Sequence, residues 1–97
     1  MNTDERQLPI PNPATSDPLS KEVLRVWISS GRQHMSIDAG MWRQPGDWGI
    51  VFADLAREIA RFYSDAGIPG QLDALQMIRT SFEAELCYPT DDEFTVP

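Results

Sequence analysis

Residues 23–38 carry apolar residues at Leu24, Val26 and Ile28 and again at Met35 and Ile37, a spacing typical of two short β-strands. Ser30-Gly31 is a plausible two-residue turn between them, because glycine supplies the positive φ that tight hairpin turns need. With this turn, one face of the hairpin carries Leu24, Val26, Ile28, Gln33, Met35 and Ile37. The opposite face pairs Trp27 with His34, Arg25 with Ser36, and Val23 with Asp38. Two strands are not stable alone, so the hairpin needs a helix layer, a second subunit or both.

Two amphipathic helices are predicted after the hairpin. In residues 48–63 the apolar positions follow steps of three and four, which places them on one stripe. Asp47 is the expected N-cap of this helix and Gly67 its C-terminal stop. A second helix is expected from Gly70 to about Tyr88, with the apolar stripe Leu72, Leu75, Ile78, Phe82 and Leu86. The short connection between the helices predicts antiparallel neighbours.

The expected fold is therefore α+β, a β-hairpin followed by two antiparallel helices (ββαα). In this two-layer sandwich the apolar face of the hairpin covers the helix pair. A two-stranded layer leaves both of its edges open. We therefore expect the hairpins of two subunits to pair edge to edge, so that a four-stranded sheet extends across a homodimer.

The chain is predicted to hold one α+β domain at residues 19–88, between a proline-rich extended arm (residues 1–18) and an acidic flexible tail (residues 89–97). The net charge of −7 is concentrated in the arm and the tail. The folded segment lacks the clustered Lys and Arg that neutralise a phosphate backbone, so nucleic-acid binding is not expected. A domain of roughly 70 residues buries only about 60% of its chain's surface, so oligomerisation is the expected source of stability.

The chain lacks the residues that most kinds of catalytic or metal site require. Cys87 is the single cysteine, which excludes an intrachain disulfide and a Cys-based zinc site, and we interpret it as a packing residue. The chain has no Gly-rich phosphate loop, nucleophile elbow or His-rich metal pattern, and residues 91–93 lack the spacing of a calcium loop. We therefore expect no cofactor and no metal. No stretch resembles a membrane span or a signal peptide, so a soluble cytoplasmic protein is expected.

Candidate site residues lie on the outer hairpin face and in the loop that follows. His34 is the single imidazole, but a partner four residues away on one strand lies about 13 Å off, so packing against Trp27 is the preferred interpretation. Trp27 is interpreted as an interface residue. For Trp42, either a contact within its own domain or a groove or subunit contact remains open. The candidate ligand or interface residues are Arg25, Trp27, His34, Asp38 and Trp42.

Several segments together resemble a known family. They are Glu22–Ile28, Pro45–Gly49, Ala53–Arg57 with Arg61–Tyr63, and Ile78–Phe82 with Pro89–Asp91. They resemble a family of short bacterial proteins known only as a domain of unknown function, number 5076, over most of residues 20–91. The resemblance implies a small soluble α+β protein, and it carries over no functional residues.

We therefore predict a non-enzymatic, self-associating protein-interaction module, more an assembly protein than an enzyme, whose further protein partner is unknown. One alternative is a small-molecule-binding protein or small enzyme with its pocket at the subunit interface, built from Arg25, His34 and Asp38, with Arg43 as a further candidate. A weaker alternative is an acidic decoy for a basic protein, which the near balance of charge in the folded segment disfavours.

Overall fold

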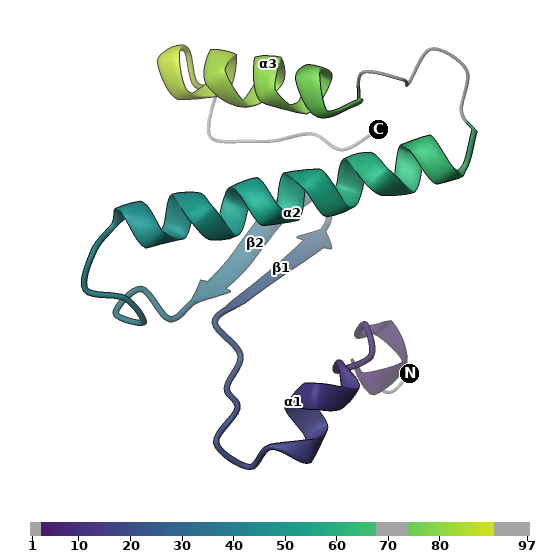
Figure 1. The fold of residues 1–97 in the computed structure, drawn as a ribbon, viewed down its shortest axis with the longest axis vertical. Coiled ribbons are helices and arrows are strands. Elements are labelled where there is room, and N and C mark those ends of the chain that lie inside the picture. The colour runs from purple at the N-terminus through teal and green to yellow at the C-terminus, as the bar shows by residue number, and fades with distance from the viewer. Residues whose placement is uncertain (1–2, 68–73, 91–97) are drawn as a thin grey trace.

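The computed structural model describes residues 3–67 and 74–90. Six elements follow one another, as Figure 1 shows: a 3₁₀-helix η1 (Thr3–Arg6), α1 (Asn12–Ser16), β1 (Leu24–Ser29), β2 (Arg32–Ile37), α2 (Gly46–Asp65) and α3 (Ala74–Cys87). The predicted ββαα order and α+β class are confirmed. The predicted start of the second helix at Gly70, and the tail beyond residue 90, lie outside the described residues.

The hairpin has the predicted register. β1 and β2 pair antiparallel, with Trp27 opposite His34, Arg25 opposite Ser36 and Val26 opposite Met35. The turn residues Ser30 and Gly31 have φ angles of 55° and 73°. Two positive φ values in a two-residue connection are typical of a type I′ turn, whose twist matches that of the flanking strands.

The turn makes a direct stability prediction. Gly31→Ala should lower the free energy of unfolding by about 1 kcal/mol, because a side chain at a left-handed φ meets its own backbone. A Cβ added at Gly31 has nothing within 4 Å, so the cost comes from the backbone alone. Gly40→Ala is the matched control, since Gly40 also has open space around it and no positive φ. Urea unfolding of the two variants measures the difference, and equal stability would contradict the assigned turn.

The start of α2 corrects one expectation. Asp47 is not the N-cap: the helix begins at Gly46 and its N-cap is Pro45, which makes no side-chain cap hydrogen bond. Pro45 has φ −55°, the value its ring imposes, so the chain turns into the helix two residues earlier than the polar pattern indicates. Asp47 lies in the first turn, where a carboxylate is still favourable to the helix dipole.

The end of α2 is as predicted. Ala66 is the C-cap, and its backbone N–H donates to the carbonyl of Phe62. Gly67 follows with φ 64°, the left-handed conformation of a helix stop, and its N–H donates to the carbonyl of Ser64. In Figure 1, α3 then runs back across α2 in the opposite general direction. Close backbone contacts join α2 to α3, as they join β1 to β2.

The prolines of the arm suggested an extended chain, but parts of the arm are helical. It contains the short helices η1 and α1, separated by residues 7–11. In α1, Pro13 lies in the first turn, where its fixed φ suits a helix and no donor is lost. The Thr15 hydroxyl donates to the carbonyl of Asn12 at 2.9 Å. The division of the chain into an arm, a domain and a tail stays a prediction.

The two layers face each other without closing. The apolar face of the hairpin is turned toward α2, and a groove of about 460 Å³ lies between them. Among the residues that the structure describes, Ala74 is the one buried hydrophobic residue, at 5% exposure. The side chains that the sequence assigns to a core are therefore largely accessible on one chain.

Candidate functional site

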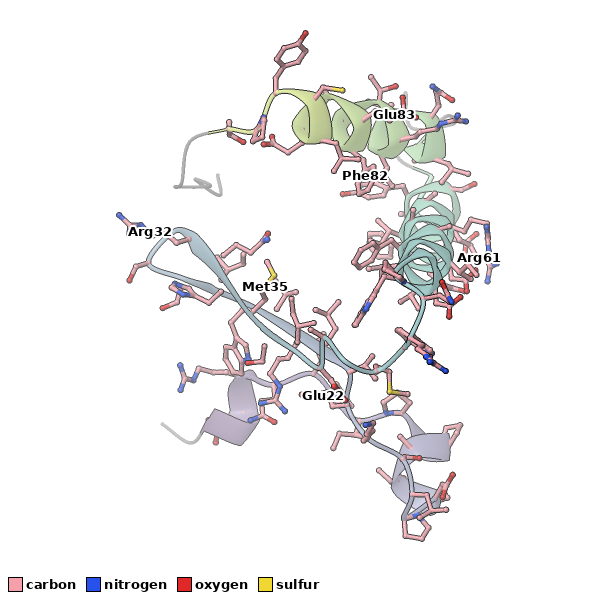
Figure 2. All side chains as sticks on the ribbon, turned by 90° about the vertical axis from the view of Figure 1, so that its left-hand side faces the viewer. Glu22, Arg32, Met35, Arg61, Phe82 and Glu83 are labelled. Carbon is pink, nitrogen blue, oxygen red and sulfur yellow. The ribbon has the colours of Figure 1, made fainter. Side chains whose placement is uncertain are left out.

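The apolar groove between the hairpin and α2 is the most distinctive feature of the surface. The hairpin contributes side chains from both strands, and α2 contributes three side chains of its first turns. Its lining residues are Leu24, Val26, Gln33, Met35, Ile37, Ala39, Trp48, Phe52 and Leu55. In Figure 2, Met35 points from the hairpin toward the helix layer, and Phe82 points from α3 toward the same space.

The helix surfaces turned away from the groove are polar and ion-paired. On α2, Arg57 pairs with Asp54, and Arg61 pairs with Glu58 at 2.9 Å. On α3, Arg79 pairs with Glu83 at 3.1 Å. Figure 2 shows Arg61 on the side of α2 away from the hairpin. Charged pairs at such exposed positions contribute little stability, but they keep these faces solvated. The apolar stripe is therefore a one-sided surface, as the sequence predicted.

The outer face of the hairpin carries the predicted Trp27–His34 pair, and the arm reaches it. The Arg6 guanidinium lies 5.8 Å from the centre of the Trp27 ring, a cation–π distance. Residues 6–11 of the arm and the length of β1 line a second groove, of about 880 Å³. Trp27 is only partly accessible as a result. The sequence did not indicate this contact, because it depends on the path of the arm.

The arm contact can be tested on its own. Arg6→Ala should remove the cation–π contact, lower the free energy of unfolding by about 0.5 kcal/mol and shift the indole N–H resonance of Trp27. Arg43→Ala removes an exposed arginine of the loop and is the matched control. If Arg6→Ala and Arg43→Ala leave the Trp27 resonance equally unmoved, the arm does not lie on β1 in solution.

The charged candidates on this face each have a local partner. Arg25 forms a two-point pair with Glu22, with Nε–Oε1 at 2.7 Å and Nη2–Oε2 at 3.2 Å. Asp38 pairs with Lys21, with Nζ–Oδ2 at 2.9 Å. His34 lies opposite Trp27 and four residues along the strand from Asp38. Arg25 and Asp38 are therefore held by ion pairs with neighbouring residues, and His34 lies in the ladder beside Trp27.

Trp42 packs within its own chain. Its ring meets that of Trp48 edge to face, with the centroids 4.9 Å apart and an interplanar angle of 83°. Trp48 in turn lies 6.0 Å from Phe52, one helical turn along α2. Aromatic pairs in this geometry add stability beyond the area that they bury. Of the two interpretations of Trp42, this contact supports the one that fastens the loop to the helix, at the end of the apolar groove.

The C-terminal end of α3 is closed by Glu85. Its carboxylate accepts hydrogen bonds from the hydroxyl of Thr90, at 2.6 Å, and from the Thr90 backbone N–H. These bonds lower the pKa of Glu85 below its usual value. Because the pKa of Glu85 is lowered in the folded state, the stability that these hydrogen bonds add is present at neutral pH. It is lost as the pH falls through the lowered pKa. Cys87 lies beside this turn and is exposed.

Two further findings concern metal binding and membrane crossing. Within residues 3–67 and 74–90, no three His, Cys, Asp or Glu side chains gather in a way that could hold a metal ion. None of the helices in the described part of the chain has the length and apolar character needed to cross a membrane.

The fold and the groove define a small α+β chain with an open apolar face, and the comparisons give its family. Residues 7–90 match the family model described as "Domain of unknown function (DUF5076)". The chain belongs to this family, as the resemblance at residues 20–91 indicated. No protein with a curated description matches the chain.

A solved structure from a photosynthetic bacterium has the same fold. It is described as "Structure of a putative pyruvate dehydrogenase from the photosynthetic bacterium Rhodopseudomonas palustrus CGA009". The two chains are 32% identical, with a TM-score of 0.71, and the similarity covers 94% of this chain and 93% of that chain. The likeness therefore extends over the whole arrangement of arm, hairpin and helices.

Proposed function

We propose that this protein is a self-associating, non-enzymatic contact module whose folded unit is a homodimer. The observation that carries the proposal is the exposure of the apolar face. Met35 is 50% exposed and Leu55 is 47% exposed, although both line the groove at the centre of the fold. Side chains of this kind contribute about 1.5–3 kcal/mol each when fully buried, so a single chain leaves much of its folding energy unused.

The surface area supports the same proposal. A compact monomer of 10.9 kDa is expected to expose about 5,600 Å². This chain exposes 8627 Å², so a single copy does not close into a compact unit of the expected surface. The Cα radius of gyration is 15.8 Å, against roughly 12.5 Å for a compact domain of this length. A second copy of the chain carries the same apolar face and is present at the same concentration. Covering this face therefore requires no other protein.

The alternative of a catalytic site receives less support. The Rhodopseudomonas protein is described as a putative pyruvate dehydrogenase. In this chain, Arg25 and Asp38 are engaged by Glu22 and Lys21. His34 has Trp27 as its cross-strand neighbour. These local pairs favour a contact surface over a catalytic site, and we do not carry the named activity over.

Thermal unfolding tests the proposal. For a dimer that unfolds to separate chains, the midpoint rises with protein concentration, because association stabilises only the folded state. Between about 1 μM and about 100 μM, the rise should be roughly 7 °C for a dimer of this size. Reversible rescans serve as the control against aggregation. A midpoint that does not move over this range would contradict the proposal.

A further inference from the structure

The hairpin leaves one set of backbone groups unpaired on each edge. The N–H of Asp38 donates to the carbonyl of Val23 at 2.9 Å, so this is a hydrogen-bonded pair. Bonded and non-bonded pairs alternate along an antiparallel ladder, so Arg25–Ser36 and Trp27–His34 are bonded pairs as well. The remaining residues direct their backbone groups outward. On the outer edge of β2 these are Gln33, Met35 and Ile37.

The two edges of the hairpin are not equivalent. The arm lies on the β1 side of the hairpin: residues 6–11 line a common groove with β1, and Arg6 lies over the ring of Trp27. In the described part of the chain neither strand makes close backbone contact with a helix, so the arm residues beside β1 are what distinguishes the two edges. Every residue of β2 is exposed, whereas Leu24 and Trp27 of β1 are partly covered. The β2 edge is therefore the one that is open to another strand.

We propose that β2 pairs antiparallel with β2 of a second copy, with Met35 opposite Met35 of the partner subunit on the two-fold axis. This inference rests on the proposed self-association and specifies its edge and its register. Three residues of each β2 then exchange hydrogen bonds, and the two hairpins form one four-stranded sheet. A two-fold axis perpendicular to the sheet keeps both apolar faces on the same side, facing one helix layer.

Side-chain direction and charge select the register. A one-residue slip would set apolar side chains against the polar face, so only pairings that centre on a residue are allowed. Centring on Met35 places Arg32 opposite Asp38 of the partner subunit, twice by symmetry, where it joins the ion pair that Asp38 makes with Lys21 of its own chain. Centring on His34 instead places the two histidines opposite each other and Arg32 opposite Ser36 of the partner subunit. Opposite charges across a strand pair are favourable, which selects the Met35 register.

The helix layer fits this arrangement. In Figure 2 the tip of the hairpin, marked by Arg32, extends away from α2, while α3 lies on the other side of the space into which Met35 points. Antiparallel pairing sets the tip of one hairpin beside the base of the other, and the base is the end of the hairpin next to α2. The second copy's α2 is thereby brought toward the exposed apolar side of α3, where Phe82 lies.

Cysteine cross-linking tests the register. Directly opposite residues of a bonded pair have Cα atoms about 5.5 Å apart, within the range of a disulfide. In a Cys87→Ser background, the Met35→Cys variant should form a covalent dimer in more than half of its chains after mild oxidation. The His34→Cys variant in the same background is the matched control and should remain largely uncross-linked.

The cross-linking results separate the register, the pairing edge and self-association. Cross-linking through His34→Cys and not through Met35→Cys would overturn the register in favour of the His34-centred one. No cross-link in either variant, with a dimer still present by ultracentrifugation, would overturn β2 pairing and leave self-association standing. Absence of any dimer in the Cys87→Ser background and in the unmodified protein would refute the proposed function itself.

Charge reversal gives an independent check. Arg32→Glu should weaken the dimer about tenfold, because it sets a carboxylate against Asp38 of the partner subunit at both ends of the interface. Adding Asp38→Arg should recover part of this loss: the pairs across the interface are then complementary again, while the Lys21–Asp38 pair within each chain is removed. A double variant that is no tighter than Arg32→Glu alone would contradict the predicted pairing.

Discussion

Met35→Glu should raise the dimer dissociation constant at least a hundredfold and leave mostly monomer at micromolar concentration. Met35 lines the apolar groove and is 50% exposed on one chain, so a second copy covers what the chain leaves open. A carboxylate there loses its hydration without a partner, and two such groups on the axis repel each other. Sedimentation velocity over a concentration series measures the change.

The control for this prediction is the same kind of change on the other side of α2. Ile50 is 61% exposed, and it shares its face with Asp54 and Arg57, away from the groove. Ile50→Glu should leave the dissociation constant within about twofold of the unmodified protein, since exposed substitutions of this kind alter stability by only about 0.5 kcal/mol. Equal losses in Ile50→Glu and Met35→Glu would point to a general charge effect instead of the groove.

Leu55→Ala should lower the free energy of unfolding by about 2–5 kcal/mol per chain, the cost of deleting a fully buried leucine. On a single chain Leu55 is 47% exposed, and the same deletion would then cost only about 1 kcal/mol. The size of the effect thus reports whether Leu55 is covered in the folded unit. Urea unfolding at a fixed, high protein concentration gives the value.

Leu19→Ala is the matched control, because it removes the same atoms from a residue that is 88% exposed. Its effect should stay within about 0.5 kcal/mol. A loss of only about 1 kcal/mol in Leu55→Ala, with Leu19→Ala near zero, would mean that the groove stays open in solution. That result would contradict the account of the groove as half of an interface.

The hairpin and the two helices could be predicted because their signals are local. Gly31 permits the turn, alternation fixes the faces, and the register follows from the turn length. Gly67 ends α2 for an equally local reason, its left-handed backbone. The cap at Asp47 was wrong because the ring of Pro45 sets the start of the helix first.

The rest depends on contacts between distant segments. The helix α1 carried a signal in Pro13, a residue well suited to a first turn, but the abundance of prolines in the arm suggested an extended chain. The position of Arg6 over Trp27 has no local signature. The groove was expected to be a closed layer, and only the exposure of its lining residues shows that one chain leaves it open.

The central claim is that the folded unit contains two chains, and sedimentation equilibrium of the unmodified protein at micromolar concentration tests it most directly. We predict a mass of twice that of one chain, which falls toward the mass of a single chain only on dilution. A folded protein that keeps the mass of one chain up to the highest concentrations would contradict it.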